Sequence, residues 1–153
     1  MKKTVFIIIS LALLLAGCKG KNEPEQPVKK ANGFTFDGKT YALDKVFVSN
    51  ISVTIKFSAE ASDHPFVITT FSNTIGKNLE PVPSWEVRLF SKEKSYKAGY
   101  LKDAGYQNDA KSGAVRIREI NKDNAEYELE FDITFTDGKI FKGYYSGKCI
   151  RPE

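Results

Sequence analysis

The stretch "AEYELEFDITF", Ala125 to Phe135, alternates between apolar and polar residues over almost its whole length. In a β-strand, successive side chains point to opposite faces, so this period of two predicts a strand with one face in the core and the other in water. The predicted core face carries Tyr127, Leu129, Phe131, Ile133 and Phe135. The predicted water face carries Glu126, Glu128, Glu130, Asp132 and Thr134.

The turn after this strand is predicted from the rule that facing residues of an antiparallel pair lie on the same side of the sheet. A two-residue turn at "DG" would set Ile133 opposite Lys142 and drive the lysine into the core. A three-residue loop, Thr136–Gly138, instead pairs Ile133 with Phe141. We therefore expect the longer loop, with Gly138 in the left-handed conformation.

The closing strand contains two glycines that this register explains. Gly143 falls opposite Phe131 and Gly147 opposite Tyr127, where a missing side chain leaves room for a ring to lie across the neighbouring strand. Cys149 joins the same inward row and is expected to be a small buried residue, since nothing near it in sequence would activate its thiol.

The preceding stretch "AVRIREI" places Arg116 and Arg118 opposite the glutamates of residues 126–130. Cross-strand pairs of opposite charge contribute roughly 0.2–1 kcal/mol each, so these acids have a structural role. Successive acids on this face lie about 6.8 Å apart, a spacing that glycosidase carboxylates also use. A flat charged face lacks the burial that a catalytic acid needs, and no enzymatic role is predicted.

Other segments repeat the strand pattern. Ile51–Phe57 is interpreted as one strand with Ile51, Val53, Ile55 and Phe57 on its inner face, and "FTFDGKTY" as a hairpin that pairs Phe34 with Tyr41. Alternation also marks Trp85 to Leu89 and Val115 to Ile117, whereas Pro65 to Phe71 is apolar on both faces. Since no stretch keeps a helical period, we predict an all-β fold over residues 34–153, a single antiparallel β-sandwich or flattened barrel of about eight strands.

The N-terminus has the layout of a secretion signal. Lys2 and Lys3 precede an apolar run from Thr4 to Leu15, which is shorter than the roughly 20 residues of a transmembrane helix. "LAGC", Leu15 to Cys18, resembles the lipobox of bacterial lipoproteins. This resemblance implies removal of residues 1–17 and acylation of Cys18, and several acyl chains bind a membrane durably.

The residues after the cysteine are polar. Residues 18–33 are predicted to be the lipidated cysteine followed by a flexible tether. The lipobox resemblance places the protein in the cell envelope, with the membrane as a partner through Cys18. Lys19, where an aspartate would signal inner-membrane retention, favours the outer membrane in a Gram-negative cell. An acylated Cys18 also leaves Cys149 without a disulfide partner.

The C-terminal stretch, about Ala114 to Lys148, resembles a recurring ending of small uncharacterised Bacteroidetes lipoproteins, with an alternating strand, a "DGK" turn and a glycine-rich closing strand. The resemblance implies a β-sandwich or a lipocalin-like barrel and no particular activity.

Charge and motifs exclude several function classes. From Phe34 onward, 17 Lys and Arg balance 17 Asp and Glu, which is not the basic profile of a nucleic-acid-binding domain. His64 is the single histidine, and "NKDN" at residues 121–124 lacks the acids of a calcium loop. There is no glycine-rich phosphate loop. We predict no cofactor, no metal site and no nucleic-acid partner.

The segment "SYKAGYLKDAGYQNDAKSGA", residues 95–114, is interpreted as a mobile loop that presents tyrosines. Amphipathic rings suit a glycan- or peptide-binding surface. The candidate ligand-binding residues are Tyr96, Tyr100, Tyr106 and, if it faces outward, Trp85. The alternative is structural: Tyr96 and Tyr100 pack on the sheet, Tyr106 caps the loop and Trp85 belongs to the core.

The leading hypothesis is therefore a lipid-anchored, non-catalytic binding or adhesion module whose partner is a glycan or an envelope protein. A second hypothesis is assembly with an envelope protein through an exposed strand edge. A third is a lipocalin-like carrier, in which Phe66 and Phe71 would line an internal cavity for a small apolar molecule.

Overall fold

The computed structural model describes residues 30–60 and 64–152. Cys18, the predicted signal segment and most of the predicted tether lie outside these residues. Within them, no helix has the length and apolar character needed to cross a membrane.

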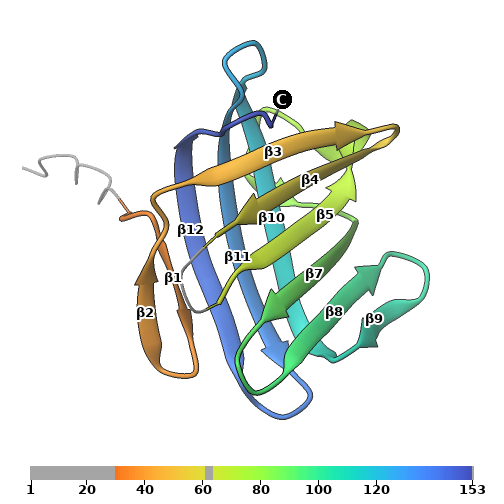
Figure 1. Cartoon of the computed structure of the whole chain (residues 1–153). Helices are drawn as coiled ribbons and strands as arrows, with labels where there is room; N and C mark the ends of the chain where they lie inside the picture. Colours follow the sequence, from red (N-terminus) through yellow and green to blue (C-terminus); the bar gives the residue numbers. More distant parts are fainter. Residues whose placement is uncertain (1–29, 61–63, 153) are drawn as a thin grey trace, which may run out of the picture.

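Two six-stranded antiparallel sheets pack against each other (Figure 1). The first sheet has the order β2-β1-β12-β11-β10-β6, and its strands are β1 (Gly33–Phe36), β2 (Lys39–Ala42), β6 (Glu80–Pro81), β10 (Ala110–Asn121), β11 (Glu126–Phe135) and β12 (Ile140–Lys148). The second sheet has the order β3-β4-β5-β7-β8-β9, and its strands are β3 (Val46–Ile51), β4 (Thr54–Ala59), β5 (Phe66–Phe71), β7 (Ser84–Phe90), β8 (Ser95–Leu101) and β9 (Gly105–Asn108). A 3₁₀ turn (Ser72–Thr74) follows β5. The prediction of an all-β antiparallel sandwich is confirmed, with twelve strands among the described residues in place of about eight.

Part of the difference lies at Ile51–Phe57, which is not one strand. A two-residue turn at Ser52 and Val53 separates β3 from β4, with Ser52 at φ 57°. Ile51 and Val53 are 60% and 64% exposed, so the prediction that they share the inner face with Ile55 and Phe57 was wrong. The alternating sequence pattern continues through this two-residue turn. The turn reverses the two faces, so odd-numbered residues point outward before it and inward after it.

The segment 95–114 also contains more strands than predicted. It folds as β8, β9 and the start of β10, so the interpretation as a mobile loop was wrong. The alternating positions of "SYKAGY" bury Tyr96 and Ala98 on the inner side of β8, which is the pattern of a strand.

The strand registers predicted around β11 are confirmed. Ile133 faces Phe141 across a three-residue loop, with Gly138 at φ 87°. Phe131 faces Gly143, where a Cβ atom would lie 2.3 Å from the ring of Phe131. The predicted pairs of Arg116 with Glu130 and Arg118 with Glu128, and of Phe34 with Tyr41, are also present.

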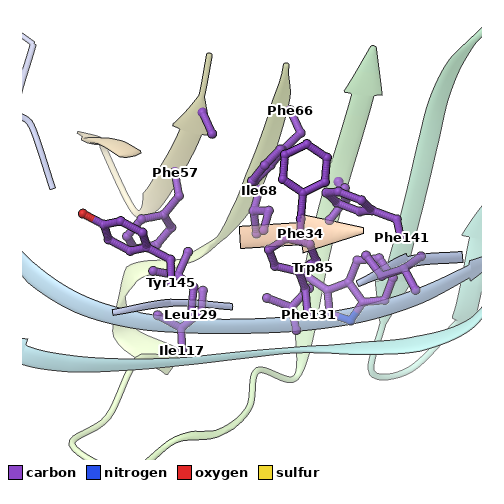
Figure 2. Packing of buried hydrophobic residues seen from close by; sticks show 14 of the residues in the cluster. Phe34, Phe57, Phe66, Ile68, Trp85, Ile117, Leu129, Phe131, Phe141 and Tyr145 are labelled. Carbon is purple, nitrogen blue, oxygen red and sulfur yellow. The ribbon is translucent and has the colours of Figure 1, made fainter. Parts of the chain in front are cut away.

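Aromatic rings from both sheets fill the space between them (Figure 2). Phe34 of β1 lies edge-on to Phe66 of β5 and Phe141 of β12, at ring-centroid distances of 5.4 and 5.6 Å. Phe131 packs 4.5 Å from Phe141. Phe71, at the end of β5, points to the outside and is half-exposed. The predicted pair Phe66 and Phe71 therefore does not line a common internal cavity.

One strand edge, that of β3, is covered by the chain, whereas the edge at β2 is open among the described residues. After β12 the chain crosses to the second sheet, where Ile150 exchanges hydrogen bonds with β3: the Val48 N–H donates to the Ile150 carbonyl, and the Ile150 N–H donates to the Val46 carbonyl, both at 2.8 Å. Strand β2 pairs with β1 on one side, and no described strand pairs with its other side.

Candidate functional site

A row of side chains crosses the outer face of the second sheet. Lys56 of β4 faces Thr69 of β5, Thr69 faces Glu86 of β7, and Glu86 faces Gly99 of β8, which faces Gln107 of β9. Lys56, Thr69 and Glu86 lie on the solvent side because their chain neighbours point into the core. Gly99 and Gln107 continue the same row through the strand register. At Gly99 the row has no side chain, and the surface is hollowed there.

The resulting hollow has a volume of about 320 Å³. We call it the outer hollow, lined chiefly by Thr69, Phe71, Glu86, Gly99, Leu101 and Gln107. Its floor is formed by Gly99, where a Cβ atom would lie 3.3 Å from the carbonyl oxygen of Trp85. Phe71 and Leu101 stand at its side with 42% and 46% of their surface exposed. The outer hollow thus combines a bare backbone floor with two apolar walls.

Three polar side chains at the outer hollow, Glu86, Gln107 and Thr54, already have partners within the protein. The carboxylate of Glu86 accepts a hydrogen bond from Arg88 Nε at 2.8 Å and lies 3.4 Å from Lys97 Nζ. The side-chain amide of Gln107 donates to the carbonyl of Ala104 at 3.0 Å. The Thr54 hydroxyl at the margin donates to the Ile51 carbonyl at 2.8 Å. What remains available to a ligand is chiefly apolar surface.

The apolar surface continues beyond the outer hollow toward the β3–β4 turn. The N–H and hydroxyl of Ser72 both donate to the carbonyl of Val53, at 2.9 and 3.1 Å, which holds this turn beside the end of β5. Phe71 faces Thr54 of β4, and Thr54 faces the exposed Ile51 across the turn. Exposed apolar groups that gather in one place typically mark an interaction site.

Of the four predicted ligand-binding residues, Trp85 and Tyr100 lie at the outer hollow, and Tyr96 and Tyr106 lie outside it. Trp85 and Tyr100 face each other on β7 and β8 and contribute to the lining of the outer hollow. The Trp85 side chain itself is buried in the core, and Tyr100 packs between Trp85 and Tyr106. Tyr96 is buried, and its hydroxyl donates to Asp137 at 2.9 Å.

Tyr106 remains exposed but is bonded through its hydroxyl. That hydroxyl donates to the Gly113 carbonyl at 3.0 Å and accepts from the Gly113 N–H at 3.1 Å. It thereby ties β9 to the start of β10. Tyr106 does not line the outer hollow.

Sequence reasoning missed the residues that form the outer hollow: Phe71, Gly99 and Leu101. A signal was present in "KAGYLK", because Gly99 and Leu101 share the face opposite to Tyr100 once this segment is recognised as a strand. Because the segment was interpreted as a loop, this alternation between the two faces of a strand was not used. The position of Phe71 beside them could not be deduced without the strand order.

The outer face of the first sheet has a different character. Glu128 is 7% exposed, accepts a hydrogen bond from the Tyr144 hydroxyl at 2.7 Å and forms an ion pair with Arg118. Beside it, Glu130 forms ion pairs with Arg116 and Lys30. Glu128 and Glu130 thus have charged partners within the protein.

His64 has a packing role. Its ring lies edge-on to Phe36 and Tyr41, at centroid distances of 5.3 and 4.9 Å. Among the described residues, no group of three or more His, Cys, Asp or Glu side chains is arranged to hold a metal ion. Comparisons with family models, curated proteins and solved structures gave no match.

Proposed function

We propose that this protein is a lipid-anchored component of a bacterial cell envelope that binds a partner, without catalysis, through the outer hollow of the second sheet. The observation that carries the proposal is the bare floor at Gly99, which shares the outer hollow with the exposed side chains of Phe71 and Leu101. Exposed aromatic and aliphatic groups beside a concavity are typical of binding surfaces.

The packing of the interior supports binding at the surface over carriage of a small apolar molecule inside. Rings from both sheets meet at ordinary contact distances where a carrier would need a cavity, as between Phe66 and Phe141, whose ring centroids are 5.1 Å apart. The outer hollow also supplies a single carboxylate, Glu86, which Arg88 and Lys97 already hold. A catalytic acid–base pair needs a second titratable group that converges on the same point.

The described start of the chain lies on the opposite sheet from the outer hollow. The Asn32 side chain accepts from the Ser146 N–H at 2.8 Å and donates to the Ser146 carbonyl at 3.2 Å. Lys30 pairs with Glu130 and lies 5.2 Å from the ring of Tyr144. An anchor that arrives at the first sheet leaves the second sheet free to face a partner.

The anchor is tested by Cys18→Ser in the native cell. We expect the unchanged protein to sediment with membranes and to carry a mass increase from acyl chains. The variant should lose both properties. A variant that still sediments with membranes would show that Cys18 does not anchor the protein.

The binding surface is tested by site-specific photo-cross-linking in the same cells. A benzoylphenylalanine at Phe71 should give a discrete cross-linked product. The matched control is Phe90, which is equally exposed at 42% on the same sheet but does not line the outer hollow. Equal products from both positions, or none from position 71, would contradict the proposed surface.

The free edge of β2 supports a second candidate function, assembly by strand addition. The edge carries Lys39, Thr40 and Ala42, all exposed, and an unpaired edge can accept another strand. Sedimentation of the purified protein over a range of concentrations tests this function. Association that disappears in Thr40→Pro would support it, whereas a monomer at all concentrations would count against self-assembly.

A further inference from the structure

We infer that the partner of the outer hollow is a protein segment with a bulky apolar side chain flanked by acidic residues. The apolar side chain would enter between Phe71 and Leu101 and rest on Gly99. This inference rests on the proposed function and specifies the chemistry of its ligand.

The state of the polar lining favours an apolar group over a sugar. A saccharide is recognised by several free donors and acceptors that converge on its hydroxyls, because hydroxyls that enter a site without partners lose their bonds to water. Here Glu86, Gln107 and Thr54 already bond within the protein. Among the described Thr, Ser, Asn and Gln side chains of the lining, Thr69 and Asn108 have no hydrogen-bond partner, which is fewer groups than a saccharide needs. The volume of about 320 Å³ is near the lower limit of small-molecule pockets, and it suits one large side chain.

The charges that border the outer hollow specify the flanking residues. On β4, β7 and β8, the outer face presents Lys56, Arg88 and Lys97 against one acid, Glu86, and a second acid, Asp109, accepts a hydrogen bond from the Lys97 N–H. Three bases against two acids leave this part of the surface with a small positive charge, although residues 34–153 are neutral overall. Lys56 forms no ion pair with any described residue, and it faces Thr69 of the lining. Charge complementarity therefore favours a partner with acidic residues beside its apolar anchor.

The test is a selection of random displayed peptides of about twelve residues on the full-length protein purified from membranes in detergent. We expect the enriched peptides to share a Leu, Phe, Ile or Trp with Asp or Glu nearby. Synthetic versions should bind, and replacing the apolar residue by Ala should weaken binding at least about tenfold. Raising the salt from about 0.1 to about 1 M, which shortens the screening length from roughly 10 to 3 Å, should also weaken it.

Matched variants of the protein locate the binding. Phe71→Ala and Leu101→Ala should each reduce peptide affinity at least about tenfold, whereas Phe90→Ala and Ile140→Ala should leave it unchanged. Phe90 and Ile140 are exposed to a similar degree, 42% and 51%, and lie outside the outer hollow.

The outcomes separate this inference from the proposed function. Failure to enrich any peptide, enrichment without acidic residues, or equal binding to Phe71→Ala would overturn the inferred partner chemistry. A glycan product cross-linked from position 71 would also overturn it, while the proposed function would stand. Absence of any product from position 71 would remove the proposed function itself.

Discussion

The outer faces of the two sheets come from the same alternating sequence pattern, but they differ in how far their side chains pair with one another. On the first sheet, Glu128 is enclosed by Tyr144 and Arg118, and the neighbouring acid and base side chains pair with each other. On the second sheet, a glycine interrupts the row, and Phe71 and Leu101 stay half-exposed around it. On the first face, charged side chains pair within the protein. On the second face, apolar side chains remain exposed, and a partner could cover them.

This contrast separates stability from binding. A substitution on the first outer face should change the free energy of unfolding and leave binding intact. A substitution at the outer hollow should do the reverse. The predictions below test this separation, from the largest expected effect to the smallest.

The largest effect is expected in the core that both sheets share. Phe131→Ala removes a buried ring that packs on Phe66 and Phe141. The free energy of unfolding should fall by about 3–5 kcal/mol, because the substitution loses buried apolar surface and leaves a cavity. Urea denaturation followed by circular dichroism measures the change. A loss below about 1 kcal/mol would show that the rings do not hold the sheets together.

The next effect belongs to the first outer face. Glu128→Ala leaves the Tyr144 hydroxyl and Arg118 without their shared acceptor, and it should lower the free energy of unfolding by about 1–3 kcal/mol. The control is Asp132→Ala, which breaks the exposed pair with Lys142 and should cost about 0–1 kcal/mol. Equal losses in the two variants, measured by urea denaturation, would mean that the Glu128 network is not special.

Alkaline pH should affect the closing end of the first sheet. Burial raises the pKa of Tyr145 to about 12, and burial also raises the pKa of the Cys149 thiol to about 12 from its ordinary value of 9.0. The unfolded chain therefore releases these protons at lower pH than the folded chain does. Stability should be independent of these groups below pH 9 and should fall as pH rises from about 9 to 12.

Denaturation at a series of pH values, compared with Cys149→Ala, measures this loss. In the native protein at neutral pH, the buried thiol should also resist modification by a disulfide reagent that reacts readily with the denatured chain. Rapid modification of the native protein would contradict the burial of Cys149.

The smallest effect on stability is expected at the outer hollow. Phe71→Ala should change the free energy of unfolding by no more than about 0.5 kcal/mol, since the side chain is half-exposed at the end of β5. Urea denaturation of this variant beside Phe90→Ala tests the point. A loss of several kcal/mol would assign Phe71 to the fold and weaken its role in binding.

The sequence predicted the fold best where alternation and turn chemistry agreed. One rule, that facing residues of an antiparallel pair lie on the same side of the sheet, predicted three features correctly. They are the length of the loop at Gly138, the pairing of Ile133 with Phe141 and the position of Gly143. The prediction failed at Ser52 and Val53, because this dipeptide lacks the Asn-Gly or Asp-Gly signal of a two-residue hairpin turn.

The candidate site was harder to predict because its residues come from different strands. Trp85 and Tyr100 were identified from their residue type, but Trp85 is buried in the core and Tyr100 is partly buried against it. Phe71 and Leu101 come together through the order β5-β7-β8, which alternation within single strands does not specify. The role of Gly99 as the floor of the outer hollow depends on its cross-strand neighbours Glu86 and Gln107.

The most direct test of the contrast compares two similarly exposed aliphatic positions on opposite outer faces, Leu101 at 46% and Ile140 at 51%. A photo-cross-linking residue is placed at each position in turn in the native cell, and the yields of partner product are compared. We predict a discrete product from position 101 and at most background from position 140. Equal yields from the two positions, or a product from position 140 alone, would contradict the assignment of binding to the second sheet.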